Sequence, residues 1–536
     1  MKYLNLILIN LLFASSLIAG TAGGTLNNPQ KMNIVFFLVD DLGWRDIGIN
    51  GSEFYETPRI DQFAKEGVRF TNAYATCHVC SPSRASLLTG KYPARLNLTD
   101  WLSGRKNFPF QKLKNNEINQ HLPFEENTLA EYLRDNGYAT AIYGKWHLGE
   151  EESSPLKHGF QERMTEWNKG WPLTYFPPYK LPGLKDGKNG EYLTDRVTKE
   201  AIGYIERNKE HPFFLYLSHF AVHDPIQGRP DLVEKYRKKL LNMKYGAKAQ
   251  KPFILETSQD QENPLSRQQL DELLKDERYK GYGNLPDRTV KIKQLQDNIQ
   301  FAAMVESMDE SFGKVIDKLK ELGIYNNTIV VFVSDNGGMS AMNMGNPNRK
   351  IVEKDVMKNF STSNLPLRGA KGWLYEGGLR VPMIMNWPNH IKKGFVSDIP
   401  VIGTDFYPTL LEMVGLPAQP AQHADGVSLV PLLTSNKQQS KMLKDRALYW
   451  HFPHYSNHSL ESPGGAIRYG DYKLIEYFEN NTIQLFNLKK DIEEQRDLSK
   501  QDPKKAEQLR QMLHEWRKSL SLKDMQLNAA YTGEQN

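Results

Sequence analysis

The sequence predicts an α/β fold with a central, mostly parallel sheet, followed by a smaller C-terminal α+β domain. Three apolar runs rich in β-branched and aromatic residues, at 32–39, 213–218 and 328–334, carry this prediction. Continuous apolar runs of this length are typical of strands buried on both faces, as in parallel sheets. Helical patterns separate the runs, and this alternation indicates a layered α/β sandwich.

The first residues have the pattern of a signal peptide. Lys2 precedes an apolar run at 4–17, and small residues follow at 19–24. We therefore expect residues 1–22 to be removed on export, and the protein to be periplasmic or secreted. The run is too short to predict a membrane span, and no Cys follows it, so we expect no stable membrane anchor.

The first buried strand, at 32–39, ends in Asp40 and Asp41. Open α/β sheets bind ligands at the carboxyl ends of their strands, and adjacent carboxylates repel each other unless a cation offsets the charge. The alternative is an exposed acidic turn. Residues 57–72 are expected to form a short helix that leads to the loop of Cys80.

Two further strands end in basic side chains. A helix at 129–136, capped by Thr128 or Asn127, precedes a strand at 138–143 that ends near Lys145 and His147. An isolated His is more often structural than catalytic, but its place on a Gly-bracketed loop favours function. The strand at 213–218 is followed by His219, a neighbour or core residue, and by His223, the better catalytic candidate.

The rest of the first domain, 30–430, contains one polar segment and one more buried strand. Residues 228–288 are polar and charged and predict a surface insertion, whereas 301–322 has the spacing of a packed helix. The strand at 328–334 ends in Asp335 and Asn336, which could also mark a simple turn. A Gly-rich loop then carries Lys371 into a strand at 381–387.

The pattern changes after about residue 430. Short strands are expected at 447–450, 465–469, 472–477 and 482–487, and a charged helix at 503–520. This spacing predicts a C-terminal α+β domain over 431–520, in which an antiparallel sheet packs on a helix. We expect the tail, 521–536, to be loosely ordered.

Only two cysteines, Cys77 and Cys80, occur among the 536 residues. This pair has three interpretations: a redox motif, half of a zinc site, or one functional Cys next to a Cys without a functional role. The third is favoured because a redox motif would need its own short thioredoxin-like βαβ context and zinc would need more ligands nearby. Separately, Pro82 and Ser83 suit the start of a helix, where an anion is stabilised, and Arg84 adds a fixed charge.

These residues together describe a site for a compact oxyanion. Carboxylate and amide oxygens suit Ca²⁺, or alternatively Mg²⁺, better than zinc. The surrounding basic side chains would bind a sulfate or phosphate ester. A net charge of +5 is compatible with an anionic substrate and is too small to indicate nucleic-acid binding.

The segment Cys80-Ser81-Pro82-Ser83-Arg84, closed by Thr89-Gly90, resembles the signature of the type I sulfatases, within the alkaline phosphatase superfamily. The resemblance implies an alkaline-phosphatase-like sandwich around a mixed, mostly parallel sheet. It implies that a formylglycine-generating or anaerobic maturation enzyme oxidises Cys80 to formylglycine (3-oxoalanine). It further implies calcium ligation by Asp40, Asp41, Asp335, Asn336 and the modified Cys80, stabilisation of formylglycine by Arg84, and sulfate contacts from Lys145, His147, His223 and Lys371.

In the mechanism that this resemblance implies, the hydrated aldehyde attacks sulfur, His223 protonates the leaving oxygen with help from Lys371, and His147 then deprotonates the second hydroxyl. Residues 92–95 and 98–102 are similar to bacterial polysaccharide sulfatases, so we expect a sulfated carbohydrate substrate, either algal polysaccharide or glycosaminoglycan fragments. The candidate sugar or carboxylate contacts are Trp101, Trp373, His451, His454 and Arg468, of which we expect one or two to contact the substrate. Two alternatives are a phosphate or phosphonate ester hydrolase on the same fold, and a non-catalytic glycan-binding relative.

Overall fold

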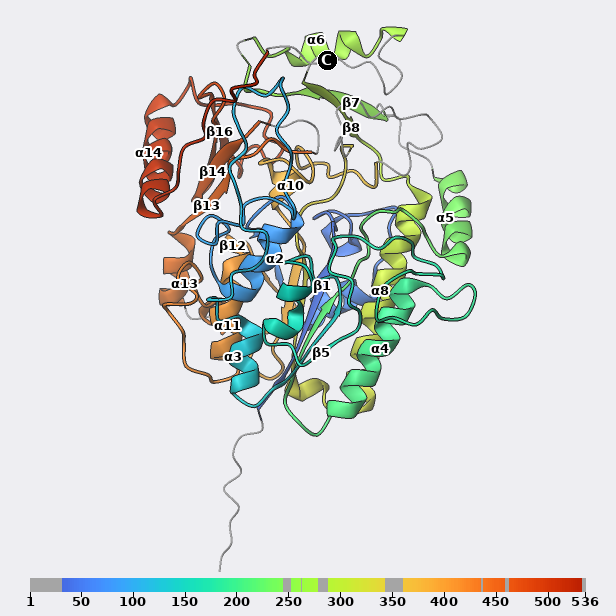
Figure 1. Ribbon diagram of the computed structural model, residues 1–536. Helices are drawn as coiled ribbons and strands as arrows, with labels where there is room; N and C mark the ends of the chain where they lie inside the picture. The colour runs from blue at the N-terminus through green and yellow to red at the C-terminus, as the bar shows by residue number, and fades with distance from the viewer. Residues whose placement is uncertain are drawn as a thin grey trace, which may run out of the picture. The chain divides into compact units, whose positions relative to one another are not determined.

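A mixed sheet of eight strands forms the centre of the computed structural model, which describes residues 31–243, 252–261, 263–277, 288–342, 360–434, 437–457 and 462–532 (Figure 1). The predicted signal peptide, 1–22, lies outside these residues. In spatial order the strands are β11 (Phe395–Ser397), β2 (Val68–Phe70), β10 (Met383–Asn386), β9 (Thr328–Ser334), β1 (Asn33–Val39), β6 (Phe213–Ser218), β4 (Ala139–Gly144) and β5 (Glu162–Arg163).

Four adjacent strands, β9, β1, β6 and β4, run parallel in the middle of this sheet. Phe37 of β1 is in register with Leu217 on one side and with Phe332 on the other. Only β10 runs antiparallel to its neighbours. The mixed, mostly parallel sheet is therefore confirmed, and the carboxyl ends of its central strands meet at one edge.

The apolar run of β1 is continuous because helices cover both faces of the sheet. Val35, Phe37 and Val39 pack in one hydrophobic cluster, whereas Ile34, Phe36 and Leu38 pack in another. The first cluster lies under α1 (Pro58–Glu66), α4 (Leu193–Asn208), α5 (Pro230–Asn242) and α8 (Ile299–Glu321). The second lies under α2 (Cys80–Thr89), α3 (Leu129–Asp135) and α11 (Phe406–Met413) (Figure 1).

Local capping fixes the start of α3 as predicted. The Thr128 hydroxyl accepts a hydrogen bond from Glu131 N at 3.1 Å, and the Glu131 carboxylate accepts one from Thr128 N at 2.8 Å. The helix predicted at 57–72 is too long, because α1 ends at Glu66. Residues 68–70 instead form β2, where pairing with β10 and β11 outweighs helix propensity.

The segment 228–288 is only partly a surface insertion. A hairpin of β7 (Phe253–Thr257) and β8 (Thr289–Lys293) stands outside the main sheet, with α6 (Arg267–Leu273) beside it. The prediction is wrong for α5, since Leu232, Val233 and Tyr236 are buried in the first hydrophobic cluster. Its polar composition belongs to the outer face of an amphipathic helix.

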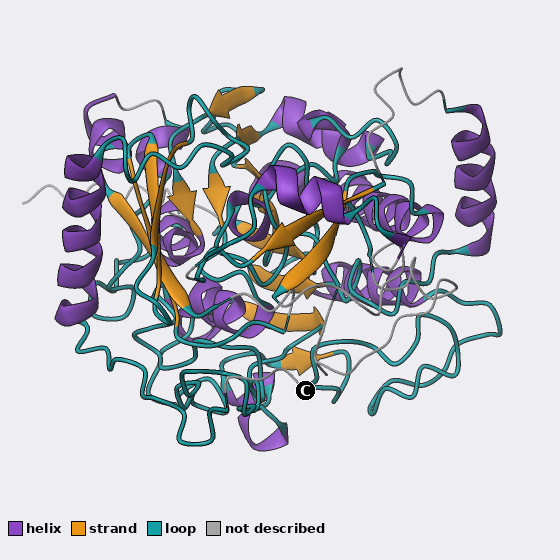
Figure 2. Cartoon of the chain, turned by 90° about the horizontal axis from the view of Figure 1, so that it is seen from above, coloured by secondary structure: helices purple, strands orange, loops and turns teal. Residues whose placement is uncertain are grey.

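The C-terminal part contains the predicted antiparallel sheet and helix. The strands β13 (Ala447–Phe452), β14 (Gly464–Tyr469), β15 (Tyr472–Tyr477) and β16 (Ile483–Asn487) pair in sequence order, and α14 (Pro503–Ser519) packs along them (Figures 1 and 2). Shorter elements are β3 (Ala73–Tyr74), β12 (Val401–Ile402), α10 (Glu376–Leu379), α12 (Val430–Leu433) and α13 (Lys437–Lys444). The boundaries 30–430 and 431–520 stay predictions.

The expectation of a loose tail is wrong for the described residues after α14. Lys114 N donates to Gln526 O at 2.8 Å, Asn528 N donates to Lys112 O at 3.0 Å, and Thr532 N donates to Pro109 O at 2.9 Å. The tail is held by backbone pairing with a distant loop, which its own polar sequence does not indicate. No helix in the described part of the chain is long and apolar enough to cross a membrane.

A fully buried lysine joins the C-terminal sheet to the main domain. Lys473 of β15 contacts Glu376 of α10 at 3.0 Å and Glu494 at 2.9 Å, and all three side chains are inaccessible to solvent. Removing one partner of a buried ion pair leaves an uncompensated charge. Loss of Lys473 would therefore destabilise the contact between the two parts.

We expect Lys473→Met to lower the free energy of unfolding by about 3–5 kcal/mol, because two buried carboxylates lose their shared cation. The measurement is the thermal midpoint, compared with that of Lys504→Met on the exposed face of α14. The control should change the stability by about 0.5 kcal/mol or less. Equal midpoints for the two variants would contradict this prediction.

Candidate active site

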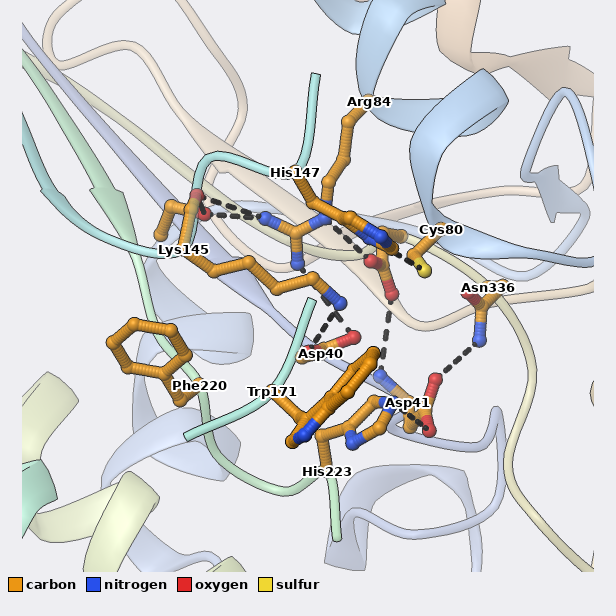
Figure 3. A network of polar contacts seen from close by, with 12 residues as sticks. Asp40, Asp41, Cys80, Arg84, Lys145, His147, Trp171, Phe220, His223 and Asn336 are labelled. Carbon is orange, nitrogen blue, oxygen red and sulfur yellow. Dashed lines mark hydrogen bonds and ion pairs between the residues drawn. The ribbon is translucent and has the colours of Figure 1, made fainter. Parts of the chain in front are cut away.

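The functional residues predicted from the sequence meet at the carboxyl edge of the central strands (Figure 3). Asp40 and Asp41 follow β1, and Asp335 and Asn336 follow β9. The segments after β4 and β6 supply Lys145, His147 and His223, α2 supplies Cys80 and Arg84, and Lys371 comes from the loop before α10. Residues from six separate segments thus form one site.

The three carboxylates of the site and the amide of Asn336 are arranged as ligands for a hard cation. Asp41 N donates to Asp335 Oδ1 at 3.2 Å, and Asn336 Nδ2 donates to Asp41 Oδ1 at 2.8 Å. Asp40 Oδ1 and Asn336 Oδ1 are buried and lack a hydrogen-bond partner among the described residues. Buried oxygens without donors fit a divalent metal, and ligand atoms of Asp40, Asp41 and His223 lie within 4.8 Å of one another.

Three buried cations balance these carboxylates. Arg84 Nε lies 2.8 Å from Asp335 Oδ2, Lys145 Nζ lies 2.7 Å from Asp40 Oδ2, and Lys371 Nζ lies 2.8 Å from Asp41 Oδ2. Burial raises the pKa of Asp40 to about 7, although the charge of Lys145 opposes this shift. Burial also acts to raise the pKa of Asp41, but Lys371 and its other cationic neighbours bring it below its usual range.

Arg84 is held by more than its carboxylate partner. Its Nη1 donates to Ser218 Oγ at 2.5 Å and to Lys145 O at 3.2 Å. Ser218 is the last residue of β6 and was not predicted as a site residue. A small polar residue at the end of a buried strand is the signal that marks it.

Cys80 begins helix α2, and its thiol faces His147. Cys80 Sγ lies 3.2 Å from His147 Nδ1, and His147 Nε2 lies 3.1 Å from Leu102 O. Because a carbonyl only accepts, Nε2 carries the proton and the Nδ1 lone pair points to Cys80. Burial, and then the charge of Lys145, lower the pKa of His147 well below its usual value, so the ring stays neutral.

The backbone is strained at two of these positions. Asp41 has φ of 60° and His147 has φ of 59°, in the left-handed region that non-glycine residues rarely adopt. Such conformations persist only where the surrounding contacts enforce them, and they concentrate at functional sites. In both residues the strain directs the side chain into the site.

His223 lies between acidic and basic partners. Its Nδ1 is 2.6 Å from Asp224 Oδ1, and its Nε2 is 3.1 Å from Lys371 Nζ and 3.6 Å from Asp41 Oδ2. Burial and Lys371 act to lower the pKa of His223, but Asp41, Asp224 and Asp40 together raise it to about 9. Asp224 was missed from the sequence, although it directly follows the catalytic candidate.

A cavity of about 420 Å³ opens over this centre. Cys80, His147, His223 and Lys371 lie on its wall together with Trp101, as expected for a sugar contact. Trp171, which Figure 3 shows beside His223, also lines it and was not predicted. The remaining described wall residues are Val79, Ser103, Gly104, Arg105, Lys106, Phe108 and Asn457.

The other four expected sugar contacts are buried and do not belong to the described wall of this cavity. Trp373 packs beside Tyr375 in a hydrophobic cluster, with ring centres 5.7 Å apart. The Arg468 guanidinium lies 5.1 Å from the ring centre of Tyr74. His454 Nε2 lies 2.8 Å from Thr99 Oγ1, and His451 packs near Phe478. The prediction of a substrate contact is therefore wrong for four residues, which pack in the interior: Trp373, Arg468, His451 and His454.

His219 and Cys77 pack in the protein interior and are not part of the site. His219 Nε2 lies 3.0 Å from Ser311 Oγ in the core, which agrees with its interpretation as a core neighbour. Cys77 is a free, buried thiol that packs with Val79 and Phe452. Cys80 is also a free thiol, so the two cysteines form no disulfide.

Comparison with known families matches almost all of the described chain. The sulfatase family model matches residues 32–416, and the model for the C-terminal part of N-sulphoglucosamine sulphohydrolase matches residues 370–522. The first match includes all of the predicted metal ligands and the catalytic candidates Arg84, Lys145, His147, His223 and Lys371. The second covers the antiparallel sheet and α14.

Individual relatives agree with these matches. A sulfatase of Formosa agariphila is 29% identical, over 94% of this chain and 90% of its own length. The N-acetylgalactosamine-6-sulfatase of Homo sapiens is 31% identical, over 80% of this chain and 70% of its own. The crystal structure of Ps i-CgsB is similar with a TM-score of 0.67 and 27% identity, over 91% of this chain and 93% of that chain. The chain therefore belongs to the sulfatase family, with the alkaline-phosphatase-like fold, and is a sulfuric ester hydrolase.

Proposed function

We propose that this protein is an exported carbohydrate sulfatase that uses Ca²⁺ and a formylglycine formed from Cys80. The observation that carries the proposal is the position of Cys80. Its thiol lies on the wall of the cavity, 3.2 Å from a neutral His147 and close to the acidic cluster, in which Asp40 Oδ1 and Asn336 Oδ1 accept no hydrogen bond from a described residue. A nucleophile, a base and a metal site are thus adjacent.

Relatives and the cavity wall both support a carbohydrate substrate. One relative is an N-acetylgalactosamine-6-sulfatase, and a similar structure, at 27% identity and a TM-score of 0.65, is Ps i-CgsB in complex with k-i-k-neocarrahexaose. In this chain, Trp101 and Trp171 line the cavity, and aromatic faces stack on sugar rings. We infer a sulfated sugar from algal polysaccharide or glycosaminoglycan.

The donor set favours Ca²⁺, with Mg²⁺ as the alternative. Asp40, Asp41, Asp335 and Asn336 would hold the ion through oxygen atoms only, which suits a hard cation. When bound, such an ion supplies positive charge to the sulfuryl oxygens. The buried cations Arg84, Lys145 and Lys371 add to that charge and hold the carboxylates in place.

A formylglycine at position 80 would supply, as its hydrate, a hydroxyl nucleophile for the sulfur atom. His147 Nδ1 points to this side chain and is placed to accept a proton from it. His223 Nε2 lies on the cavity wall beside Lys371 and is placed to donate a proton to the leaving sugar oxygen. Asp224 orients the His223 ring through Nδ1.

We expect kcat/KM for an aryl sulfate to exceed that for the matched aryl phosphate by a factor of about 100 or more. A phosphate monoester carries more negative charge at neutral pH, and the buried cations of this site are already paired with carboxylates. Steady-state kinetics with the two 4-nitrophenyl esters measures the ratio. A ratio below one would favour the phosphate or phosphonate ester hydrolase.

Mass spectrometry of the tryptic peptide Phe70 to Arg84 tests the nucleophile directly. Protein produced in the native host should show the change from thiol to aldehyde at Cys80. An unmodified Cys80 in an active preparation would refute the formylglycine proposal. An unmodified Cys80 in a preparation without sulfatase activity would instead support a glycan-binding protein.

A further inference from the structure

The wall of the active-site cavity carries more positive charge than a single sulfate ester requires. Arg105 and Lys106 are neighbours in the chain, and both line the cavity together with Lys371. Of these three side chains, only Lys371 makes an ion pair with a described carboxylate, that of Asp41. No carboxylate belongs to the described wall residues. The cavity therefore presents two cations that the reaction at Cys80 does not use.

Arg105 is only 8% exposed, yet most of its hydrogen-bonding capacity is unused. Its Nη1 donates to Ser456 O, whereas Nε and Nη2 have no partner among the described residues. A guanidinium offers five N–H donors, and leaving buried donors unpaired costs free energy. Its positive carbon lies 5.3 Å from the ring centre of Phe108, another wall residue. The guanidinium makes no ion pair with a described residue, and the acidic influence on it is that of Asp100, which accepts a hydrogen bond from the backbone N–H of Arg105.

Lys106 differs from Arg105 in being exposed. It makes no ion pair with a described residue, and its side chain forms part of the same wall. Two adjacent cations, one held by packing and one free to adjust, suit an anionic group of variable position. A neutral sugar would gain little from either of them.

Hydrogen bonds connect the loop that carries Arg105 and Lys106 to the residues around Cys80. Asp100 accepts hydrogen bonds from Trp101 N at 2.8 Å and from Arg105 N at 3.1 Å. Leu102 N donates to Ser81 Oγ at 3.1 Å, and Leu102 O faces His147 Nε2. The positions of Arg105 and Lys106 are thereby tied to α2 and to His147.

We propose that Arg105 and Lys106 form a second anion subsite, so that the substrate carries another anionic group besides the sulfate ester that is cleaved. This group is a second sulfate ester or a uronate carboxylate on the same or the adjacent sugar. Trp101, Phe108 and Trp171 supply apolar faces for the sugar rings between the two anions. The inference rests on the proposed function and names the class of its substrate.

Binding to the Cys80→Ala variant tests the subsite without requiring turnover. Isothermal titration calorimetry compares galactose, N-acetylgalactosamine and glucosamine 6-sulfates with their disulfated forms, and with 6-sulfated disaccharides that carry an adjoining uronate. The same titrations are repeated with Arg105→Gln or Lys106→Gln added. Arg95→Gln, which removes a cation paired with Asp425, is the matched control.

In at least one matched set, the second anion should lower Kd by a factor of about 10 or more. Arg105→Gln and Lys106→Gln should each reduce this increase in affinity, and so should added salt. The Arg95→Gln variant should show the same increase in affinity as the parent protein. A gain with the disulfated sugars alone identifies a second sulfate, and a gain with the uronates alone identifies a carboxylate.

The subsite is refuted if no second anion lowers Kd by more than about twofold, or if the gain survives the double variant Arg105→Gln/Lys106→Gln. Lys106→Gln keeps the test valid where Arg105→Gln does not fold, because Lys106 is exposed. The outcome is separate from that of the proposed function. Failure of the wild-type protein to hydrolyse any sulfate ester would refute the latter and leave these binding data unaffected.

Discussion

Replacing Cys80 with Ala is expected to lower the turnover of an aryl sulfate by a factor of about 10⁴ or more. The variant keeps the buried cations and the carboxylate cluster, so it still binds the ester. It lacks the side chain that becomes the nucleophile, and His147 Nδ1 then has no proton to accept at this position. Steady-state kinetics on protein matured in the native host measures the loss.

Cys77→Ala is the matched control for this variant. Cys77 is also a buried, free thiol, but it packs against Val79 and Phe452 and is not part of the described cavity wall. We expect its turnover to remain close to that of the wild type, with a modest loss of stability from the small cavity. Near-normal turnover of Cys80→Ala would contradict the proposed mechanism.

The centre of the fold was predictable because burial on both faces leaves a strong local signal. The apolar runs at 32–39, 213–218 and 328–334 correspond to β1, β6 and β9 to within one residue. Parallel strands place their carboxyl ends at one edge, so the polar residues that follow each run had to meet. This is why Asp40 and Asp335, far apart in the chain, could be assigned to one site.

Features that depend on distant pairing could not be predicted in this way. Residues 68–70 form a strand because β10 and β11 lie beside them, and the tail is ordered because residues 109–114 offer backbone partners. The same holds for the cavity wall. Trp171 and Arg105 reach the site from loops without a periodic pattern, whereas Trp373 lies in a hydrophobic cluster that only the folded chain defines.

The second large effect is expected from Asp40→Asn, which should remove the metal and lower turnover by a factor of about 10²–10³. Asp40 is inaccessible to solvent, with Oδ2 bonded to Lys145, whereas Oδ1 lies 3.6 Å from Arg84 Nη2 and accepts no hydrogen bond from a described residue. An amide removes one negative charge and directs N–H groups either at Lys145 or at the ion. Elemental analysis of the purified protein measures the metal content, and kinetics measures the loss.

Asp46→Asn separates loss of the metal from loss of a buried carboxylate. Asp46 is equally buried and close in sequence, but its oxygens accept from Gly43 N, Thr362 and Gln296, so its carboxylate is already satisfied. This control should lose stability and keep both its metal and its turnover per folded molecule. Both variants remove one buried carboxylate charge, but Asp40 also pairs with Lys145, so the metal content has to be measured in each variant alongside its turnover. If Asp40→Asn retains a full complement of Ca²⁺, the negative charge of Asp40 is not required to hold the ion, and the prediction is wrong.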